Sequence, residues 1–432
     1  MKEDFLHYLW KFKKFDFIGA TTTQGQELQV LKPGMHNHLA GPDFFNAQVR
    51  IDGQLWAGNV EVHLKSSDWY AHHHERDTAY ENVILHVVWE HDVDVYDRTN
   101  RALPTLELRH FVKKDILSNY FRLFSRSQKK FINCERDITE VPIPVMDTWM
   151  ERLFFERLER KVGEIDLLLQ ESANDWEAVL FKMLARNFGT KINAGSFMEM
   201  ARLIPFSTIR KCRGNNGQLE AMFLGACDLL PPETQDVHVQ GLKKEYEFLK
   251  VKFGVSQKIS QPVQFFKLRP QNFPTIRLSQ LAKLYEQEDS LFSRLISAKA
   301  KKEIYDVLQV ESSAFWTTHY TFEKAHKPRK KMLSPGFMDL IIINTIMPLT
   351  FAYWQRQDAY KEDVLLGLIN SLPREKNSVV NGFVDLRPLK KSALVSQALL
   401  RLKNEYCDKN RCLHCAVGNY LITDAQGGSP KL

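Results

Sequence analysis

Four residues whose side chains can do acid–base or metal chemistry stand close together in the first part of the chain: Asp43, Glu61, His63 and Lys65. Asp43 follows a Gly-Pro pair and opens one expected strand, and Glu61 lies inside the next strand of the same expected hairpin. Because strand side chains alternate between faces, Glu61, His63 and Lys65 share one face. A carboxylate from each of two paired strands can bind one Mg²⁺ or Mn²⁺ ion, and a neighbouring cation can stabilise a phosphoryl oxyanion.

This pattern predicts hydrolysis of phosphodiester bonds. Asp43 and Glu61 are the expected ligands of the Mg²⁺ or Mn²⁺ ion. His63 or Lys65 is expected to stabilise the scissile phosphate. The alternative is that these residues form the polar, solvated face of an ordinary hairpin.

Histidines are concentrated in the same region, because eight of the fourteen lie between residues 36 and 91. They are His36, His38, His63, His72, His73, His74, His86 and His91. Histidines with carboxylates suit Zn²⁺, Mn²⁺ or iron. His63 shares a face with Glu61 and His74 precedes Asp77, so these two are the best candidate ligands, whereas His86 lies in an apolar run typical of the core. The competing prediction is a His/carboxylate metallohydrolase that acts on a small molecule.

A second candidate metal site lies near the C-terminus, where Cys407, Cys412 and Cys415 form a C-x4-C-x2-C pattern. Thiolates at this spacing can bind Zn²⁺ or an iron–sulfur cluster. The fourth ligand remains open among four residues: His414, Cys134, Cys212 and Cys227. The alternative is a set of free cysteines without a metal.

The elements that must position these residues differ along the chain. Residues 27–108 contain short alternating runs typical of strands, and Asp52-Gly53 between two of them predicts a tight hairpin. The later sequence has helical periodicity. We therefore predict an α+β protein, with a mainly β domain over residues 1–115, a linker over 116–144, a helical domain over 145–405, and a cysteine cluster and tail over 406–432.

Composition narrows the class of protein. The chain has 432 residues, 44% of them hydrophobic, and only six cysteines, which excludes a disulfide scaffold and favours the cytoplasm. The N-terminal residues mix charges with apolar side chains and predict an amphipathic helix, not a signal peptide. The apolar stretch 340–354 is short for a membrane span and predicts a buried helix. A net charge of +7 and a basic run at residues 323–332 permit nucleic-acid binding.

Two family resemblances add to these expectations. Pro42-Asp43, Glu61 and the segments that follow resemble the PD-(D/E)XK nuclease superfamily, which places Pro-Asp on one strand and Glu-x-Lys on the next, followed by a helix and another strand. This sequence departs from that pattern because His63 stands where the lysine is expected and the nearest lysine is Lys65. Several nucleases of that superfamily join an upstream cysteine to a C-terminal cysteine group through an iron–sulfur cluster, which favours Cys134 as the fourth ligand.

The chain also resembles a bacterial family named domain of unknown function 2851. The words that carry this resemblance are AGPDFFNAQV, GNVEVHLKSSDWYAHHHERDTAYENVILHVV, RPQNFPTIRLSQLA and EYCDKNRCLHCAVG. It implies a cytoplasmic bacterial protein and brings no activity. The sequence thus predicts a metal-dependent nuclease-like protein, with a small-molecule metallohydrolase or a non-catalytic nucleic-acid-binding scaffold as alternatives, and it leaves protein partners unknown.

Overall fold

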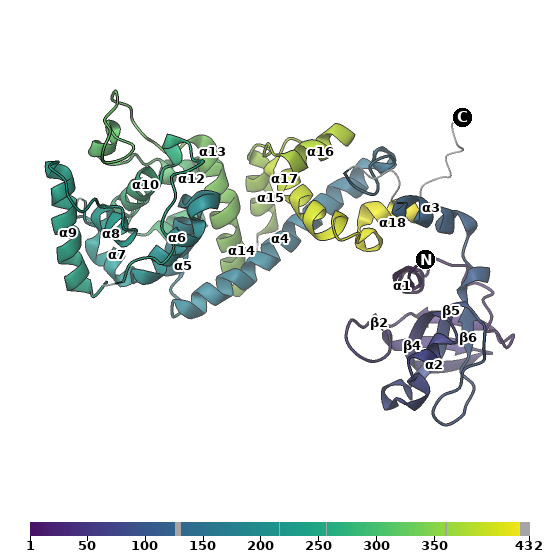
Figure 1. Ribbon diagram of the computed structural model, residues 1–432. Coiled ribbons are helices and arrows are strands. Elements are labelled where there is room, and N and C mark those ends of the chain that lie inside the picture. The colour runs from purple at the N-terminus through teal and green to yellow at the C-terminus, as the bar shows by residue number, and fades with distance from the viewer. Residues whose placement is uncertain (126–130, 216, 256, 359–360, 424–432) are drawn as a thin grey trace. The chain divides into compact units, whose positions relative to one another are not determined.

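The computed structural model describes residues 1–423 except 126–130, 216, 256 and 359–360. The chain divides into two compact units (Figure 1). Unit 1 comprises Met1–Met150, Asn377–Pro388 and Leu399–Leu432, and unit 2 comprises Glu151–Lys376 and Leu389–Ala398. The division differs from the predicted boundaries, because the C-terminal segment with its cysteines belongs to the same unit as the N-terminal strands.

Unit 1 contains one mixed sheet, which confirms the predicted α+β class with a mainly β N-terminal part. Its strand order is β1-β3-β4-β5-β6, and β2 pairs with β3. β1, β3 and β4 are antiparallel neighbours, whereas β5 runs parallel to β4, and β6 runs parallel to β5. The strands are β1 (Leu28–Lys32), β2 (Met35–His36), β3 (Phe44–Ile51), β4 (Gln54–Lys65), β5 (Val83–Glu90) and β6 (Thr105–Glu107).

The hairpin between β3 and β4 turns where the sequence predicts it. Asp52 and Gly53 both have positive φ, at 46° and 81°, and Ile51 pairs with Gln54. Two consecutive residues with positive φ make a two-residue turn whose twist matches that of the strands. This turn fixes the register of β4 and therefore the face on which its polar residues lie.

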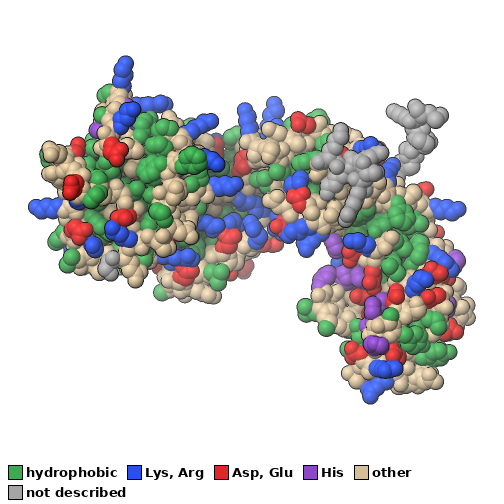
Figure 2. Space-filling view, in the orientation of Figure 1, with side chains coloured by type: hydrophobic (Ala, Val, Ile, Leu, Met, Phe, Trp, Pro, Cys, Tyr) green, Lys and Arg blue, Asp and Glu red, His purple; other side chains and the backbone are tan. Residues whose placement is uncertain are grey.

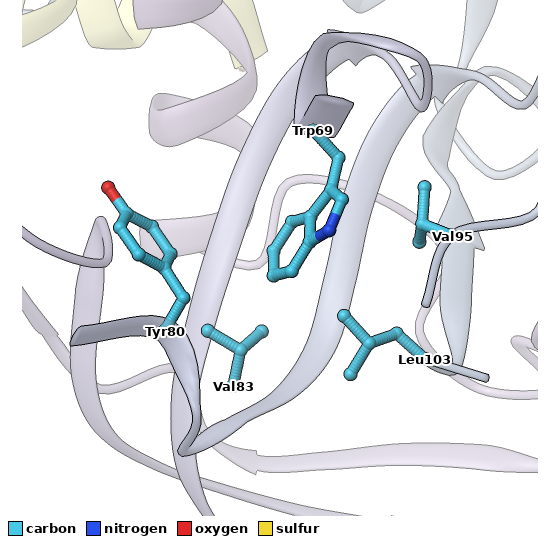
Figure 3. Close-up of a cluster of buried hydrophobic side chains, with 5 residues drawn as sticks. All are labelled: Trp69, Tyr80, Val83, Val95 and Leu103. Carbon is cyan, nitrogen blue, oxygen red and sulfur yellow. The ribbon is translucent and has the colours of Figure 1, made fainter. Parts of the chain in front are cut away.

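The parallel connection from β4 to β5 passes through short helical turns. These are α2 (Asp68–Ala71), η1 (His74–Arg76) and η2 (Thr78–Tyr80). Trp69 of α2 is fully buried in a hydrophobic cluster (Figure 3). Its indole N–H donates to the Tyr96 carbonyl at 3.1 Å. The other members of the cluster are Tyr80, Val83, Val95 and Leu103. The cluster thereby holds the segment that carries His72 and His74.

Helices from both ends of the chain complete unit 1. The predicted N-terminal amphipathic helix is α1 (Glu3–Lys11), which packs against β4 and buries Phe5, Leu6, Leu9 and Trp10. α18 (Ala416–Thr423) packs against α3 (Lys114–Phe124). The remaining elements of this unit are the 3₁₀ turn η3 (Leu108–His110), η5 (Ile138–Glu140), α16 (Ser378–Leu386), η9 (Leu402–Cys407) and η10 (Cys412–His414).

Unit 2 is helical, as predicted, and two helices cross the division between the units: α4 (Ile143–Glu171) and α17 (Ala393–Arg401). The other α-helices are α5 (Trp176–Phe188), α6 (Thr190–Leu203), α7 (Phe206–Cys212), α8 (Gln218–Ala226), α9 (Val237–Phe253), α10 (Pro274–Gln287), α11 (Leu291–Ser297), α12 (Lys301–Leu308), α13 (Pro335–Ile341), α14 (Met347–Arg356) and α15 (Glu362–Ser371). The short turns are η6 (Pro270–Asn272), η7 (Ala314–Thr317) and the π-helical segment η8 (Ile342–Ile346).

The apolar stretch of unit 2 belongs to a helix longer than the sequence suggests. α13, η8 and α14 form one continuous helix, Pro335–Arg356, which is long and apolar enough to cross a membrane by length and composition. Of its most apolar 18-residue window, 78% is buried inside the protein. The core helix of a folded domain has the same properties.

Candidate metal centre

The centre of the candidate site is β4, which lies between β3 and β5 in the sheet. Glu61 and His63 are two residues apart on β4 and are both buried, with 5% and 1% of their surface exposed. His86 of β5 pairs with Glu61 in the parallel register and is fully buried. Charged and polar residues this deep in a sheet need specific partners, because burial without them costs several kcal/mol.

Asp43 and Glu61 lie together, as the hairpin requires. The Asp43 N–H donates to Glu61 Oε2 at 3.0 Å, and the Val62 N–H donates to Asp43 Oδ2 at 3.0 Å. Each carboxylate is therefore fixed by the backbone beside the other. Two carboxylates this close repel each other when both are ionised, which makes the pair a natural place for a cation.

Histidine nitrogens surround the other oxygen of Glu61. His63 Nε2 lies 3.5 Å and His74 Nε2 lies 3.3 Å from Glu61 Oε1. His63 Nε2 is also 3.1 Å from Nδ1 of His72. Ligands bound at about 2.0–2.1 Å to a tetrahedral Zn²⁺ ion lie roughly 3.3 Å apart. Ligand atoms of His63, His72 and His74 all lie within 4.8 Å of one another, so these three imidazoles could bind one metal ion, and Glu61 Oε1 lies beside two of them.

The protonation states suit metal binding. Burial, followed by the nearby His74 and His72, lowers the pKa of His63 to about 3, and burial also lowers the pKa of His74. Both imidazoles are then neutral at physiological pH, which is the form that binds metal. Burial, followed by the charge of Asp43, raises the pKa of Glu61 to about 8. A carboxylate in this position is stable as an anion only when a cation compensates it.

One buried nitrogen of the cluster lacks a hydrogen bond. His74 Nε2 makes no hydrogen bond of good geometry within the described part of the chain, although Glu61 Oε1 lies 3.3 Å away, and only 10% of its side chain is exposed. Buried polar atoms rarely lack a hydrogen bond, so this nitrogen suits a metal ligand. Tyr80 stacks on the His74 ring with centroids 3.8 Å apart, and Trp69 meets its edge. The hydrophobic cluster thus aims this nitrogen at Glu61.

Further contacts orient the candidate metal ligands. His63 Nδ1 lies 2.9 Å from His86 Nε2, so a metal-bound His63 can donate its remaining N–H to His86. His73 adopts a left-handed conformation with φ of 61° between His72 and His74. This residue and His72 are exposed. Figure 2 shows histidine side chains gathered on the surface of the β-containing part. His72 therefore marks the open side of the cluster.

Sequence reasoning missed two residues of α1. Glu3 and His7 form a second group of possible metal ligands with Asp43, and their ligand atoms all lie within 4.8 Å of one another. His7 Nε2 is 3.2 Å from Asp43 Oδ2. The sequence contains a signal for this pair, because Glu3 and His7 are four residues apart and residues at that spacing lie on the same face of a helix. What the sequence could not supply was that this helix packs against β4.

Other predicted residues lie outside the cluster. Lys65 is exposed at the end of β4, where its N–H donates to the Asp68 carboxylate. No contact within the described residues joins its side chain to Glu61 or His63. His36 and His38 lie beside α1, where the His36 ring is 5.0 Å from that of His7. Of the two candidates for stabilising a phosphate, only His63 lies beside Glu61.

The candidate cysteine ligands separate by unit. Cys134, Cys407, Cys412 and Cys415 belong to unit 1, and no disulfide joins any of them. Cys212 and Cys227 belong to unit 2 and are buried there. Within unit 1, Cys134 is therefore the available cysteine partner for the C-terminal group.

Comparisons with known proteins add a family without an activity. No curated protein and no solved structure matches the chain. One family model, described as "Protein of unknown function (DUF2851)", matches residues 3–378, which include all the histidine and carboxylate residues of the cluster. The match ends before the C-terminal cysteines. On this match, the chain belongs to the DUF2851 family.

Proposed function

We propose that unit 1 is a metal-dependent hydrolase that cleaves phosphodiester bonds. Its metal ion would be bound by Glu61, His63 and His74, with the exposed His72 completing the coordination. The observation that carries this proposal is that ligand atoms of His63, His72 and His74 all lie within 4.8 Å of one another, with Glu61 Oε1 at 3.5 Å from His63 and 3.3 Å from His74. Neutral imidazoles and a buried carboxylate without a compensating cation support the same interpretation.

The ligand chemistry points to Zn²⁺ or Mn²⁺. Mg²⁺ prefers oxygen ligands, whereas imidazole nitrogens suit transition metals. Such an ion lowers the pKa of a bound water molecule and polarises a phosphoryl oxygen. A catalytic site also needs a position for water or substrate. The exposed His72 lies where an incoming ligand could replace it.

Asp43 and His7 are the expected proton-transfer pair. The Val62 N–H holds the Asp43 carboxylate in place. His7, which lies on α1, brings its Nε2 to 3.2 Å from the same carboxylate. Burial lowers the pKa of His7, but the hydrogen bond and charge of Asp43, with the charges of Glu3 and Asp4, outweigh burial and leave that pKa above its usual value. His7 is therefore able to donate a proton to a leaving group near neutral pH.

The order of elements supports a phosphodiester as the substrate. The nuclease superfamily named above places Pro-Asp and then Glu on successive strands, followed by a helix and a further strand. Here the corresponding elements are the start of β3, the middle of β4, then α2 and β5. In this proposed correspondence, Asp43 and Glu61 would take the two carboxylate positions and His63 would take the place of the usual lysine. The net charge of +7 also favours a polyanionic substrate.

Cleavage assays test the proposal. Labelled single-stranded and double-stranded DNA and RNA are incubated with the purified protein in Mn²⁺, Zn²⁺ or Mg²⁺. We expect cleavage with Mn²⁺ or Zn²⁺ that is abolished in Glu61→Gln and in His63→Ala. His73→Asn is the matched control, because Asn tolerates the left-handed conformation and the residue lies between two ligands without joining them. Nucleic-acid binding without cleavage by the metal-loaded protein would instead indicate a non-catalytic scaffold.

A further inference from the structure

An open cavity of about 870 Å³ lies within unit 2. The residues that line it fall between 271 and 338, so one compact unit supplies its walls. The two main contributors are one face of α12 and the chain segment that leads into α13. The volume is in the range of sites that bind small molecules. Because the candidate metal centre belongs to unit 1, this cavity is a separate candidate site.

The wall formed by α12 offers one lysine to a ligand. Lys301, Lys302, Tyr305 and Asp306 line the cavity, and their spacing places them on one side of the helix. Lys301 Nζ lies 3.0 Å from Oδ1 of Asp339, and the Tyr305 hydroxyl donates to the same oxygen at 2.7 Å. Lys302 is exposed, and within the described residues no carboxylate pairs with it. Its ammonium group can therefore reach a ligand in the cavity.

The wall formed by the segment before α13 offers an arginine. Arg329 and Lys330 are exposed, and both line the cavity. Lys330 Nζ lies 3.6 Å from Glu311 Oε2, whereas no carboxylate in the described part of the chain pairs with Arg329. The Arg329 backbone N–H donates to the Thr317 carbonyl at 2.9 Å, which fixes the residue in place while its side chain stays exposed. Arg329 and Lys302 are thus the two cations best able to contact a ligand.

A third basic residue of the lining, Lys331, is a buried cation whose contacts are with uncharged groups. Only 5% of its surface is exposed, and its Nζ donates to the Trp316 carbonyl and lies 3.1 Å from His326 Nε2. The same Nζ lies 4.3 Å from the centroid of the Tyr320 ring. Burial lowers the pKa of Lys331, and the charge of Arg329 lowers it further. Buried lysines are normally paired with an opposite charge, and an anion in the cavity would supply one.

A second buried cation, Arg277, is joined to the lining by hydrogen bonds. Its guanidinium group donates to Gln280 Oε1 at 2.9 Å and to Asn272 Oδ1 at 2.6 Å, and it lies 3.5 Å from the centroid of the Phe337 ring. Gln280 lines the cavity and donates in turn to the Lys331 carbonyl at 2.9 Å. Burial lowers the pKa of Arg277 to about 9, and its Nε has no hydrogen-bond partner among the described residues. Two buried cations with uncharged partners therefore add to the positive charge around the cavity.

We propose that the cavity binds a free nucleotide, with Lys302 and Arg329 in contact with its phosphate groups. Five basic residues and one acidic residue line the cavity, so its charge selects an anion. Arginine and lysine suit phosphate, because their charge-assisted hydrogen bonds are roughly twice as strong as neutral ones. A phosphate group here would also bring negative charge to the side of the buried Lys331. This ligand site goes beyond the hydrolase activity proposed for unit 1 and does not depend on it.

The remaining walls suit the base of a nucleotide. Met332, Leu333 and Met338 supply apolar surface, and the flexible side chain of methionine adapts well to a flat ring. Gln271 and Gln309 are exposed on the lining, where their amide groups can donate to and accept from the edge of a base. An inorganic phosphate ion would contact only the basic part of this lining. A ligand with both an aromatic base and a phosphate group matches the whole of it better.

Calorimetric titration of the full chain tests this proposal. The probes are ATP, adenosine and a single-stranded oligonucleotide, in chelator so that no metal ion contributes. ATP should bind more tightly than adenosine. Lys302→Ala/Arg329→Ala should weaken ATP binding at least about tenfold and leave adenosine binding unchanged, because it removes two charge-assisted contacts with phosphate. Met332→Ala should weaken the binding of both ligands, because this side chain is expected to contact the base.

The matched control is Lys324→Ala/Lys327→Ala, which removes the same charge from the same basic run. Both lysines are exposed, and neither lines the cavity. Thermal unfolding of each variant checks that it is folded. Equal binding of ATP and adenosine, unchanged ATP binding by Lys302→Ala/Arg329→Ala, an equal loss in the control, or no binding of ATP would overturn the proposal. Binding of the oligonucleotide without binding of ATP would also overturn it and would assign the basic run to nucleic acid.

Discussion

At the scale of residues, the buried Glu61 carboxyl is the group that the proposed metal ion would stabilise. The neighbours of Glu61 are the Asp43 carboxylate and imidazoles that burial keeps neutral. Among the described side chains around Glu61, only His7, when it is protonated, supplies a positive charge. A buried carboxylate under these conditions is destabilised relative to its protonated form. Metal binding replaces that proton with a cation.

The pH dependence of stability follows from this carboxyl. In the metal-free protein, the pKa of Glu61 is raised from 4.5 to about 8, so the unfolded chain ionises first as the pH rises. Its contribution to stability is fully present below pH 4.5 and is lost progressively up to about pH 8. We predict that, in chelator, Glu61→Gln becomes more stable relative to the parent as the pH rises through this window. Thermal unfolding of both proteins from pH 5 to pH 8 measures the difference, and a constant difference would show that the carboxyl is not protonated in the folded state.

The proton on Glu61 also predicts that the measured enthalpy of metal binding depends on the ionisation enthalpy of the buffer. Because metal must displace the proton of Glu61 below about pH 8, binding at neutral pH should release about one proton. Calorimetric titration with Zn²⁺ in buffers of different ionisation enthalpy measures this number. Glu61→Gln should bind the ion more weakly and release less than the parent. An equal release from both proteins would assign the proton to another group.

At the scale of elements, the segment between β4 and β5 is what brings distant histidines to Glu61. Trp69 anchors α2, and the chain then turns through the left-handed His73 so that His72 and His74 both reach β4. The ring of Trp69 also contacts His86, with centroids 5.5 Å apart. The hydrophobic cluster therefore contacts the candidate metal centre through Trp69 and Tyr80, and a change in the cluster should alter the centre.

Replacing Trp69 should show this coupling. Trp69 is fully buried, so Trp69→Ala should lower the free energy of unfolding by about 3–5 kcal/mol. Metal affinity should fall as well, because His74 loses the ring that meets its edge. Trp69→Phe should recover part of both, and Leu55→Ala on the same sheet, at an exposed position, serves as the control. Urea unfolding and metal titration give the two quantities, and reduced stability with unchanged affinity would separate the two features.

The sequence predicts the elements of this site better than their assembly. Alternation along β4 places Glu61 and His63 on one face, and Asp52-Gly53 places Asp43 on the neighbouring strand, because both are local rules. The same alternation puts Lys65 on that face, but Lys65 lies at the exposed end of the strand. The packing of α1 on β4, which adds Glu3 and His7, depends on contacts between segments distant in sequence, and a single sequence does not reveal them.

At the scale of the whole molecule, unit 1 is built from both ends of the chain. The N-terminal strands carry the histidines, and residues 399–432 carry three of the four cysteines. Two predicted metal sites with different ligands therefore belong to one unit, while unit 2 has its own helical core and its own basic cavity. Sequence order suggested a separate tail, although Cys134 was among the candidate partners of the C-terminal cysteines. The structure brings Asn133 into contact with Cys412.

The most direct test of the central claim is the metal content of the purified protein at the histidine cluster. Cys412→Ser/Cys415→Ser serves as the parent, so that metal bound by these cysteines cannot contribute to the measurement. The further changes His63→Ala and His74→Ala are compared with the control His73→Asn. The account predicts about one zinc or manganese ion per chain in the parent and in His73→Asn after dialysis with the ion, and a loss of that ion in both alanine variants. The same metal content in all four proteins, or no bound metal in the parent, would contradict it.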